Sequence, residues 1–138
     1  TATKKKSRTV AAQQASMMRK RGITTTHPRQ QFCEDLMLFL QACKTQNKEI
    51  LLAGDFNEAL GTNVSGMTKL CADLGLVNLM QSHYDGIDTT PTYVRGNTRI
   101  DYVLATPHVA AACTACRYEP FQHIFTGDHR GMFVECNT

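Results

Sequence analysis

The segment Glu49-Ile50-Leu51-Leu52-Ala53-Gly54-Asp55-Phe56-Asn57 is the stretch from which the fold can be worked out. Its short apolar run ends at a glycine, which predicts a β-strand, Ile50 to Ala53, buried on both faces. Asp55 and Asn57 follow at the strand end, where α/β sheets present functional groups. Two residues apart in an extended segment, their side chains face the same side and can position a water and a phosphate oxygen together. The same two residues also suit an Asx-type turn that ends the strand.

Helices and further strands are predicted on both sides of this segment. A helix is predicted over Thr9–Arg21, ended by Gly22. A strongly amphipathic helix is predicted from Pro28 to about Gln46. Downstream, Ser65 can cap a third helix that ends at Gly75. The remaining predictions are strands at Val77–Met80, Thr92–Arg95, Arg99–Ala105, Cys116–Glu119 and Met132–Cys136, a hairpin at Gly96-Asn97, and a short helix at Pro107–Cys113. Alternation of helices and strands, with a hairpin late, predicts a layered α/β protein.

Two later segments place titratable residues beside apolar strands. In Arg99-Ile100-Asp101-Tyr102-Val103 a carboxylate lies inside an apolar strand. Burying it is costly unless it is paired, so Asp101 needs a partner such as His or Arg, or lies in water on an edge strand. Gly127-Asp128-His129-Arg130-Gly131 is a loop before the last strand. It offers one oxygen ligand for a metal and one imidazole that titrates near neutral pH.

The composition limits the class of protein. The chain has 138 residues, 42% hydrophobic and 20% charged, which suits one globular domain and excludes a disordered or collagen-like chain. No apolar run approaches the roughly 20 residues that cross a bilayer, and no apolar signal-peptide region follows the basic start. We therefore expect an intracellular protein, in the cytosol or the nucleus, with no membrane partner.

The six cysteines predict reduced thiols, because the chain is not short and shows no secretory signal. Cys33, Cys43 and Cys71 occupy apolar helical positions and are expected to behave as small core residues. Cys113 and Cys116 form a single CxxC pair. A structural zinc site normally needs four ligands, so this pair alone does not predict one.

Charge is distributed unevenly along the chain. Eight of the fifteen basic residues lie at or before Arg29, and no acidic residue precedes Glu34. The remainder carries seven basic and twelve acidic residues. We expect a basic N-terminal arm or helix over residues 1–27 and an acidic body over residues 28–138. This asymmetry fits a metal site near a polyanion, and it also fits a plain solvated helix.

In their order along the chain, the three motifs resemble those of the endonuclease/exonuclease/phosphatase superfamily, the deoxyribonuclease I-like fold. Gly54-Asp55-Phe56-Asn57 is similar to the family's Gly-Asp-x-Asn, and Arg99-Ile100-Asp101-Tyr102 to its Arg-(Ile/Leu)-Asp-Tyr. Asp128-His129 is similar to its Ser-Asp-His, with Gly127 in place of the serine, and Pro91-Thr92-Tyr93 also looks like the family. The resemblance covers about residues 28–136. It implies an α/β fold, a layered sandwich of two β-sheets flanked by helices.

The resemblance also implies a reaction, which is divalent-metal-dependent hydrolysis of phosphate esters, most often with Mg²⁺ and alternatively with Mn²⁺. Asp55 would activate the attacking water, and Asn57 would hydrogen-bond the scissile phosphate or a metal-bound water. His129 would stabilise charge on the phosphate in the transition state, with Asp101 holding it in position. The same resemblance places Asp128 and Asp55 at the metal, and Asn57, Thr92 and Arg99 at the substrate.

The sequence departs from the family in its length. Family domains are much longer, and their N-terminal half supplies an early Asn and a Glu that is a principal metal ligand. Nothing upstream of Gly54 resembles that Glu-bearing strand, since Glu34 lies on the amphipathic helix and Glu58 is expected to be a loop carboxylate. The resemblance therefore implies the C-terminal half of such a domain, incomplete at the N-terminus.

Two classes of function remain open at this point. The first is a phosphodiesterase, best described as an endonuclease acting on nucleic acid, with DNA as the expected partner. RNA or phosphoinositide substrates fit the same motifs. The second is a non-catalytic fragment, or a basic nucleic-acid-binding module of a degenerate retroelement-type endonuclease. The N-terminal half of the domain would be a further partner. Because that half supplies a principal metal ligand, the isolated chain is expected to bind Mg²⁺ weakly and cleave poorly.

Overall fold

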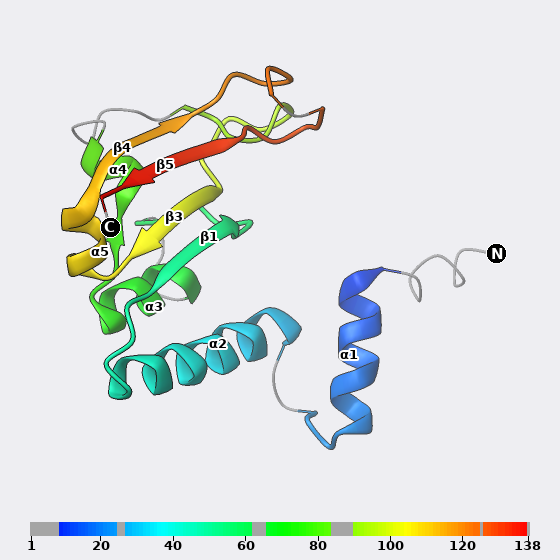
Figure 1. Ribbon diagram of the computed structural model, residues 1–138. Helices are drawn as coiled ribbons and strands as arrows, with labels where there is room; N and C mark the ends of the chain where they lie inside the picture. The colour runs from blue at the N-terminus through cyan, green and yellow to red at the C-terminus, as the bar shows by residue number, and fades with distance from the viewer. Residues whose placement is uncertain (1–8, 25–26, 62–65, 84–89, 125, 138) are drawn as a thin grey trace. The chain divides into compact units, whose positions relative to one another are not determined.

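The computed structural model describes residues 9–24, 27–61, 66–83, 90–124 and 126–137, shown as coloured ribbon in Figure 1. The chain divides into two compact units, Thr1–Phe39 and Leu40–Thr138. The predicted division into residues 1–27 and 28–138 stays a prediction. Among the described helices, none is long and apolar enough to cross a bilayer.

The first unit contains α1, Val10–Lys20, and most of α2, Pro28–Thr45. Thr9 caps α1, because its side-chain oxygen accepts from the Ala12 backbone N–H at 3.2 Å. Gly22 follows the helix with a φ of 78°, a left-handed conformation in which glycine ends a helix without strain. Both helices were predicted from the sequence, and α1 has no buried residue.

The second unit is built on two antiparallel sheets (Figure 1). One sheet has the order β1-β3-β2, and the other pairs β4 with β5. The strands are β1 Leu51–Asp55, β2 Val77–Asn78, β3 Asp101–Ala105, β4 Cys113–Tyr118 and β5 Met132–Cys136. The helices besides α2 are α3 Gly66–Leu74, α4 Leu79–His83 and α5 Pro107–Ala112.

The core lies between the two sheets. β3 is the central strand of its sheet, and every residue of it is buried. Val103 and Ala105 of this strand pack with residues of α4 and β4, namely Leu79, Met80, Cys116 and Tyr118. The Tyr118 hydroxyl also donates to the backbone carbonyl of Asp101 at 2.7 Å, so it ties one sheet to the other. The predicted α/β sandwich of two sheets with helices is confirmed.

The prediction that Ile50–Ala53 forms a strand buried on both faces is wrong. Ile50 is buried, but Leu51 is 54% exposed and the exposure of β1 alternates along the strand. The alternation shows that one face of β1 is uncovered, since successive side chains point to opposite faces. β1 also lies at the edge of its sheet, where β3 is its only partner among the described residues. The strand buried on both faces is β3, whose sequence carries the Asp101 motif.

Two of the shorter predicted strands are also wrong. Of the strand predicted at Val77–Met80, only Val77 and Asn78 are extended. The Asn78 side chain accepts from the Gln81 N–H, and this cap starts α4. Residues 92–95 form no strand and no hairpin with β3; Tyr93 makes a single antiparallel bridge, to His129. Their backbone pairs with residues 128–130, which are distant in sequence, and this pairing matters for the site below.

Other differences are smaller. The strand predicted at Cys116–Glu119 begins earlier, at Cys113, and Cys33, Cys43 and Cys71 are only partly buried. The predicted cap Ser65 lies outside the described residues. The Glu58 carboxylate caps α3, since it accepts from the Met67 and Thr68 N–H groups at the start of the helix.

Candidate active site

The centre of the candidate site is a pair formed by Asp101 and His129. The Nδ1 atom of His129 lies 3.0 Å from Oδ2 and 3.2 Å from Oδ1 of Asp101. The Asp101 side chain is 7% exposed and that of His129 is 34% exposed. The predicted pairing is confirmed, because a carboxylate on a buried strand has found an imidazole as its partner.

The Asp101 hydrogen bond raises the pKa of His129 above its ordinary value. Burial acts in the opposite direction, and the charges of Asp55 and Asp128 raise it further. Because a carboxylate oxygen only accepts, Nδ1 carries the proton in this pair. The other ring nitrogen, Nε2, lies 3.9 Å from Asp55 Oδ2, so His129 stands between the two carboxylates.

Backbone pairing with residues 91–94 holds His129 in place. Val94 N–H donates to the Asp128 carbonyl at 2.8 Å, and Arg130 N–H donates to the Thr92 carbonyl at 2.9 Å. The Tyr93 ring packs against the imidazole, with 5.0 Å between ring centroids. The Arg130 guanidinium further donates to the Pro91 carbonyl. The orientation of the imidazole is therefore set by a segment far away in the sequence.

Asp55 and Asn57 form the turn that was weighed as an alternative from the sequence. Asp55 accepts from the Asn57 backbone N–H at 2.8 Å and from its side-chain amide at 3.0 Å. Asn57 has a φ of 51°, a left-handed conformation that Asn tolerates better than most residues. The turn places the Asp55 carboxylate at the end of β1, directly opposite Asp101 in the antiparallel register.

Thr92 was predicted to touch substrate, and the structure places it elsewhere. Its side chain is fully buried, so it offers no surface to a ligand. Its hydroxyl oxygen accepts from the N–H groups of Ile100 and Asp101 at 2.9 and 3.1 Å. Since the Thr92 carbonyl also accepts from Arg130, this one residue connects the strand of Asp101 to the loop of His129.

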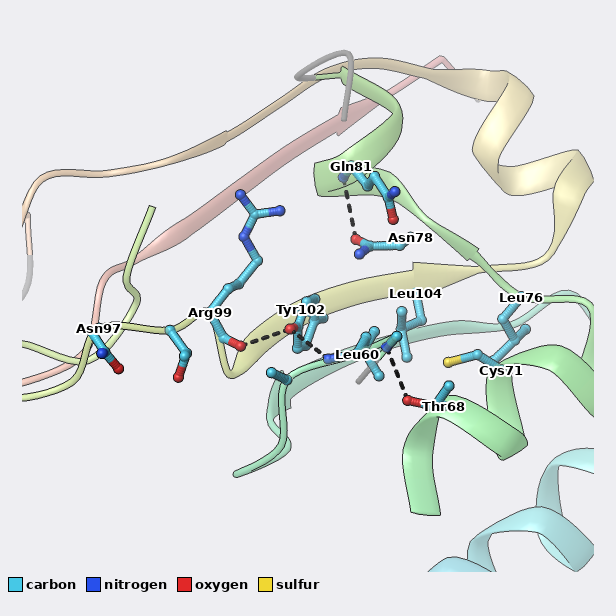
Figure 2. Close-up of a pocket in the computed structure, with 13 residues that line it drawn as sticks. Leu60, Thr68, Cys71, Leu76, Asn78, Gln81, Asn97, Arg99, Tyr102 and Leu104 are labelled. Atoms are coloured by element: carbon cyan, nitrogen blue, oxygen red, sulfur yellow. Dashed lines mark hydrogen bonds between the residues drawn. The ribbon is translucent and has the colours of Figure 1, made fainter. Parts of the chain in front are cut away.

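Arg99 lies next to the site but faces a separate cavity of about 620 Å³ (Figure 2). The walls include residues of α3, α4 and β3, and none of Asp55, Asn57, Asp101 or His129 is among them. The Tyr102 hydroxyl closes one side, since it donates to the Arg99 carbonyl at 2.7 Å and accepts from the Leu60 N–H at 3.0 Å. The role of Arg99 in substrate binding stays a prediction.

The acidic residues near the site differ in their freedom to bind a ligand. Asp128 is exposed, and its assignment as a metal ligand stays a prediction. Glu58 is engaged at the N-terminus of α3, and a Cβ added at Gly66 would lie 2.5 Å from its Oε2 atom. Glu34 accepts from the Gln30 side chain one helical turn away on α2.

A divalent cation fits part of this donor set. Ligand atoms of Asp55, Asp101 and His129 lie within 4.8 Å of one another, and no other such acidic or imidazole group occurs in the described ranges. Hard cations such as Mg²⁺ prefer carboxylate oxygens to imidazole. Asp101 is committed to His129, so Asp55 is the carboxylate of the cluster that suits a cation best.

Sequence reasoning missed three contributors to the site. The residues are Tyr93, which packs on the imidazole, Glu58, which caps α3, and Tyr118, which bonds the Asp101 carbonyl. A capping carboxylate nine residues before the N–H from which it accepts has no short-range signature. The other two contacts join segments that lie 17 or more residues apart in the chain.

Two antiparallel sheets, with a carboxylate–imidazole pair where strand ends and loops meet, define an α/β sandwich with a candidate hydrolytic site. The chain belongs to the Endonuclease/Exonuclease/phosphatase family, whose sequence pattern matches residues 20–129. No curated protein matches the sequence at a significant level.

Solved structures with the same fold include two structures of NExo from Neisseria and one of an archaeal protein. A 3′ phosphatase, NExo, from Neisseria bound to product DNA hairpin has a TM-score of 0.65 at 20% identity, over 78% of this chain and 52% of its own. The 3′-5′ exonuclease NExo from Neisseria meningitidis has 0.63 at 21%, over 78% and 53%. An AP endonuclease from Archaeoglobus fulgidus has 0.64 at 19%, over 82% and 56%. The chain thus spans about half the length of the structures it matches.

Proposed function

We propose that this chain carries the water-activating and phosphate-binding half of a divalent-metal-dependent phosphodiesterase that acts on nucleic acid, with DNA as the substrate. The observation that carries the proposal is the position of the His129 ring. Its Nδ1 atom lies 3.0 Å from Asp101 Oδ2, and its Nε2 atom lies 3.9 Å from Asp55 Oδ2. An imidazole whose pKa is raised is protonated over a wider pH range. Its Nε2–H can then donate to a phosphate oxygen as negative charge grows in the transition state.

Asp55 and Asn57 supply the other polar groups at the end of β1. The Asp55 carboxylate is a third exposed, which leaves it accessible to a water molecule that it can orient and deprotonate. Asn57 presents an amide beside it, within reach of the same phosphate. Asp101 does not contact substrate in this proposal, and its part is to fix the tautomer and direction of His129.

Asp55, with Asp128, would hold the Mg²⁺ or Mn²⁺ ion that the family resemblance implies. When bound, such an ion neutralises charge on the phosphate and lowers the pKa of water. The similar structures support DNA as the polyanion, since one is bound to a product DNA hairpin and another is an AP endonuclease. The basic residues at or before Arg29 would add nonspecific attraction to the phosphate backbone.

The test measures hydrolysis of labelled DNA duplexes that carry an abasic site, a 3′ phosphate or a recessed 3′ end, beside a supercoiled plasmid. We expect slow cleavage that requires Mg²⁺ or Mn²⁺ and stops on addition of a chelator. His129→Ala should reduce the rate by roughly 10²–10³, the usual effect of removing one donor to transition-state charge. Asp55→Asn should abolish the metal-dependent cleavage.

His108→Ala is the matched control, because His108 is also paired with a carboxylate, Glu49, at 3.2 Å but is 84% exposed on α5. It should leave the rate unchanged. DNA binding without any metal-dependent hydrolysis would refute the proposal and favour the basic nucleic-acid-binding module. Cleavage that His129→Ala does not slow would refute the assigned site.

A further inference from the structure

Two cysteines lie opposite each other at the end of the second sheet where β4 begins and β5 ends. Figure 1 shows this end of the two strands. Cys113 begins β4 and faces Cys136, which ends β5, in the antiparallel register. The flanking Asn137 N–H donates to the Ala112 carbonyl at 2.8 Å. That bond is the pattern of a non-hydrogen-bonded pair, and the register of the two strands shifts just beyond it, between Cys113 and Ala115. Non-hydrogen-bonded partners in a regular ladder have Cα atoms about 4.5 Å apart, and disulfides form at Cα separations of about 4.4–6.8 Å.

The two thiols are free and partly exposed. They are close enough that Cys136 raises the pKa of the Cys113 thiol. The other cysteine near Cys113 in the sequence is Cys116, at CxxC spacing. Cys116 is 8% exposed, and its Sγ atom lies 3.0 Å from the Met80 sulfur in the core. Burial raises the pKa of Cys116 to about 12, which keeps that thiol unreactive.

A base stands next to Cys113. The Nε2 atom of His83 lies 3.8 Å from the Cys113 sulfur. Nδ1 of the same ring lies 3.1 Å from the Leu79 carbonyl, and because a carbonyl only accepts, Nδ1 carries the proton. Nε2 therefore presents a lone pair to the Cys113 sulfur, whose S–H can also donate to the Ala115 carbonyl at 3.5 Å. In the described part of the chain, the group of side chains close enough to hold a metal does not include His83 or the two cysteines. Thiol chemistry therefore suits these three residues better than metal binding.

We propose that Cys113 and Cys136 are a reversible redox pair that forms an intramolecular disulfide when a peroxide is present. The Cys113 thiol gives its proton to His83, and the sulfur attacks the peroxide oxygen to form a sulfenic acid and one water. The Cys136 sulfur then displaces the sulfenic oxygen, which leaves as a second water. Two thiols lose two electrons and two protons in total, and the peroxide is reduced to two waters. A small thiol reverses the reaction by exchange.

The disulfide would close a covalent loop that contains residues 114–135, including His129. A two-stranded sheet is only marginally stable by itself, so a link at its open end resists fraying. Burial and the neighbouring Cys136 raise the pKa of the Cys113 thiol, so oxidation at neutral pH should be slow. The oxidised chain should melt at a Tm higher by up to roughly 10 °C.

The test treats the whole chain with hydrogen peroxide at low protein concentration and digests it without reductant. We expect a peptide that joins Cys113 to Cys136, lighter by two hydrogen atoms than its separated parts, and its loss on addition of dithiothreitol. Alkylation before digestion should show that peroxide protects both cysteines equally. The Tm of oxidised chain should fall back to the starting value after reduction.

Cys113→Ser and Cys136→Ser should each abolish the joined peptide and the Tm rise. Cys33→Ser is the matched control, since Cys33 is also partly exposed but lies on α2, and it should keep both. A link between Cys113 and Cys116 would overturn the proposal, as would links between chains only. Unequal protection of Cys113 and Cys136 in the unmutated chain would do the same, so the outcome does not depend on the variants folding.

Discussion

The Asp101–His129 pair gives a prediction that can be measured without any substrate. The perturbations are His129→Gln, Asp101→Asn and both together, each close in size to the original side chain. Removing His129 alone leaves the Asp101 carboxylate, 7% exposed, without the partner that Nδ1 provides at 3.0 Å. Leaving a buried acceptor unpaired costs about 1–3 kcal/mol.

The double variant removes the charge and its partner at the same time, so the two losses should not add. Residues in direct contact usually show coupling free energies of about 0.5–3 kcal/mol. His129 is a third exposed, and solvent screens part of the interaction, so we expect a coupling of about 1 kcal/mol. Urea unfolding followed by circular dichroism gives the four free energies of unfolding that the cycle needs.

The pH dependence of this coupling has a definite sign. The pKa of His129 is raised in the folded chain, so the folded state holds the proton more tightly than the unfolded state. The charge-dependent stabilisation is then complete below the unfolded pKa of about 6.5 and decreases as the pH rises through the folded pKa. The difference between the unmutated chain and His129→Gln should therefore shrink at alkaline pH.

The exposed pair His108–Glu49 provides the comparison, since its His is 84% exposed at a similar distance of 3.2 Å. His108→Gln should change the free energy of unfolding by less than about 0.5 kcal/mol. Two results would refute the reasoning about the buried pair. One is strict additivity in the Asp101–His129 cycle, and the other is a stability difference that grows as the pH rises.

Three further predictions concern residues that support the site, each measured by urea unfolding. Thr92→Val should cost about 1–3 kcal/mol, because two buried N–H groups lose their acceptor, whereas Thr92→Ser should retain most of the stability. Glu58→Ala should cost about 1 kcal/mol through loss of the α3 cap. Leu104→Ala should lower the free energy of unfolding by about 2–5 kcal/mol, because the Leu104 side chain is fully buried. Leu38 is 66% exposed, so Leu38→Ala should lower it by less than about 0.5 kcal/mol. Equal effects of Leu104→Ala and Leu38→Ala would contradict the assigned core.

The local elements of this protein could be predicted from sequence because their signals are local. Helix α2 follows from Pro28 and the apolar spacing after it, and β1 follows from its apolar run. The turn of Asp55 and Asn57 needs only two residues, so it too was within reach. The apolar setting of Asp101 indicated that it needs a partner, and the family resemblance named that partner as His129.

Exposure and long-range pairing were decided only by the tertiary structure. An apolar run looks the same whether its strand is central or at an edge, and β1 proved to be an edge strand while β3 took the buried place. Thr92 looked like a substrate residue, yet its hydroxyl holds the start of β3 and its carbonyl holds Arg130. The sequence by itself therefore determined the longer helices, the β1 strand, the turn after it, and which side chains need partners. Which segments meet depends on how the whole chain buries its apolar surface, and no short stretch of residues contains that information.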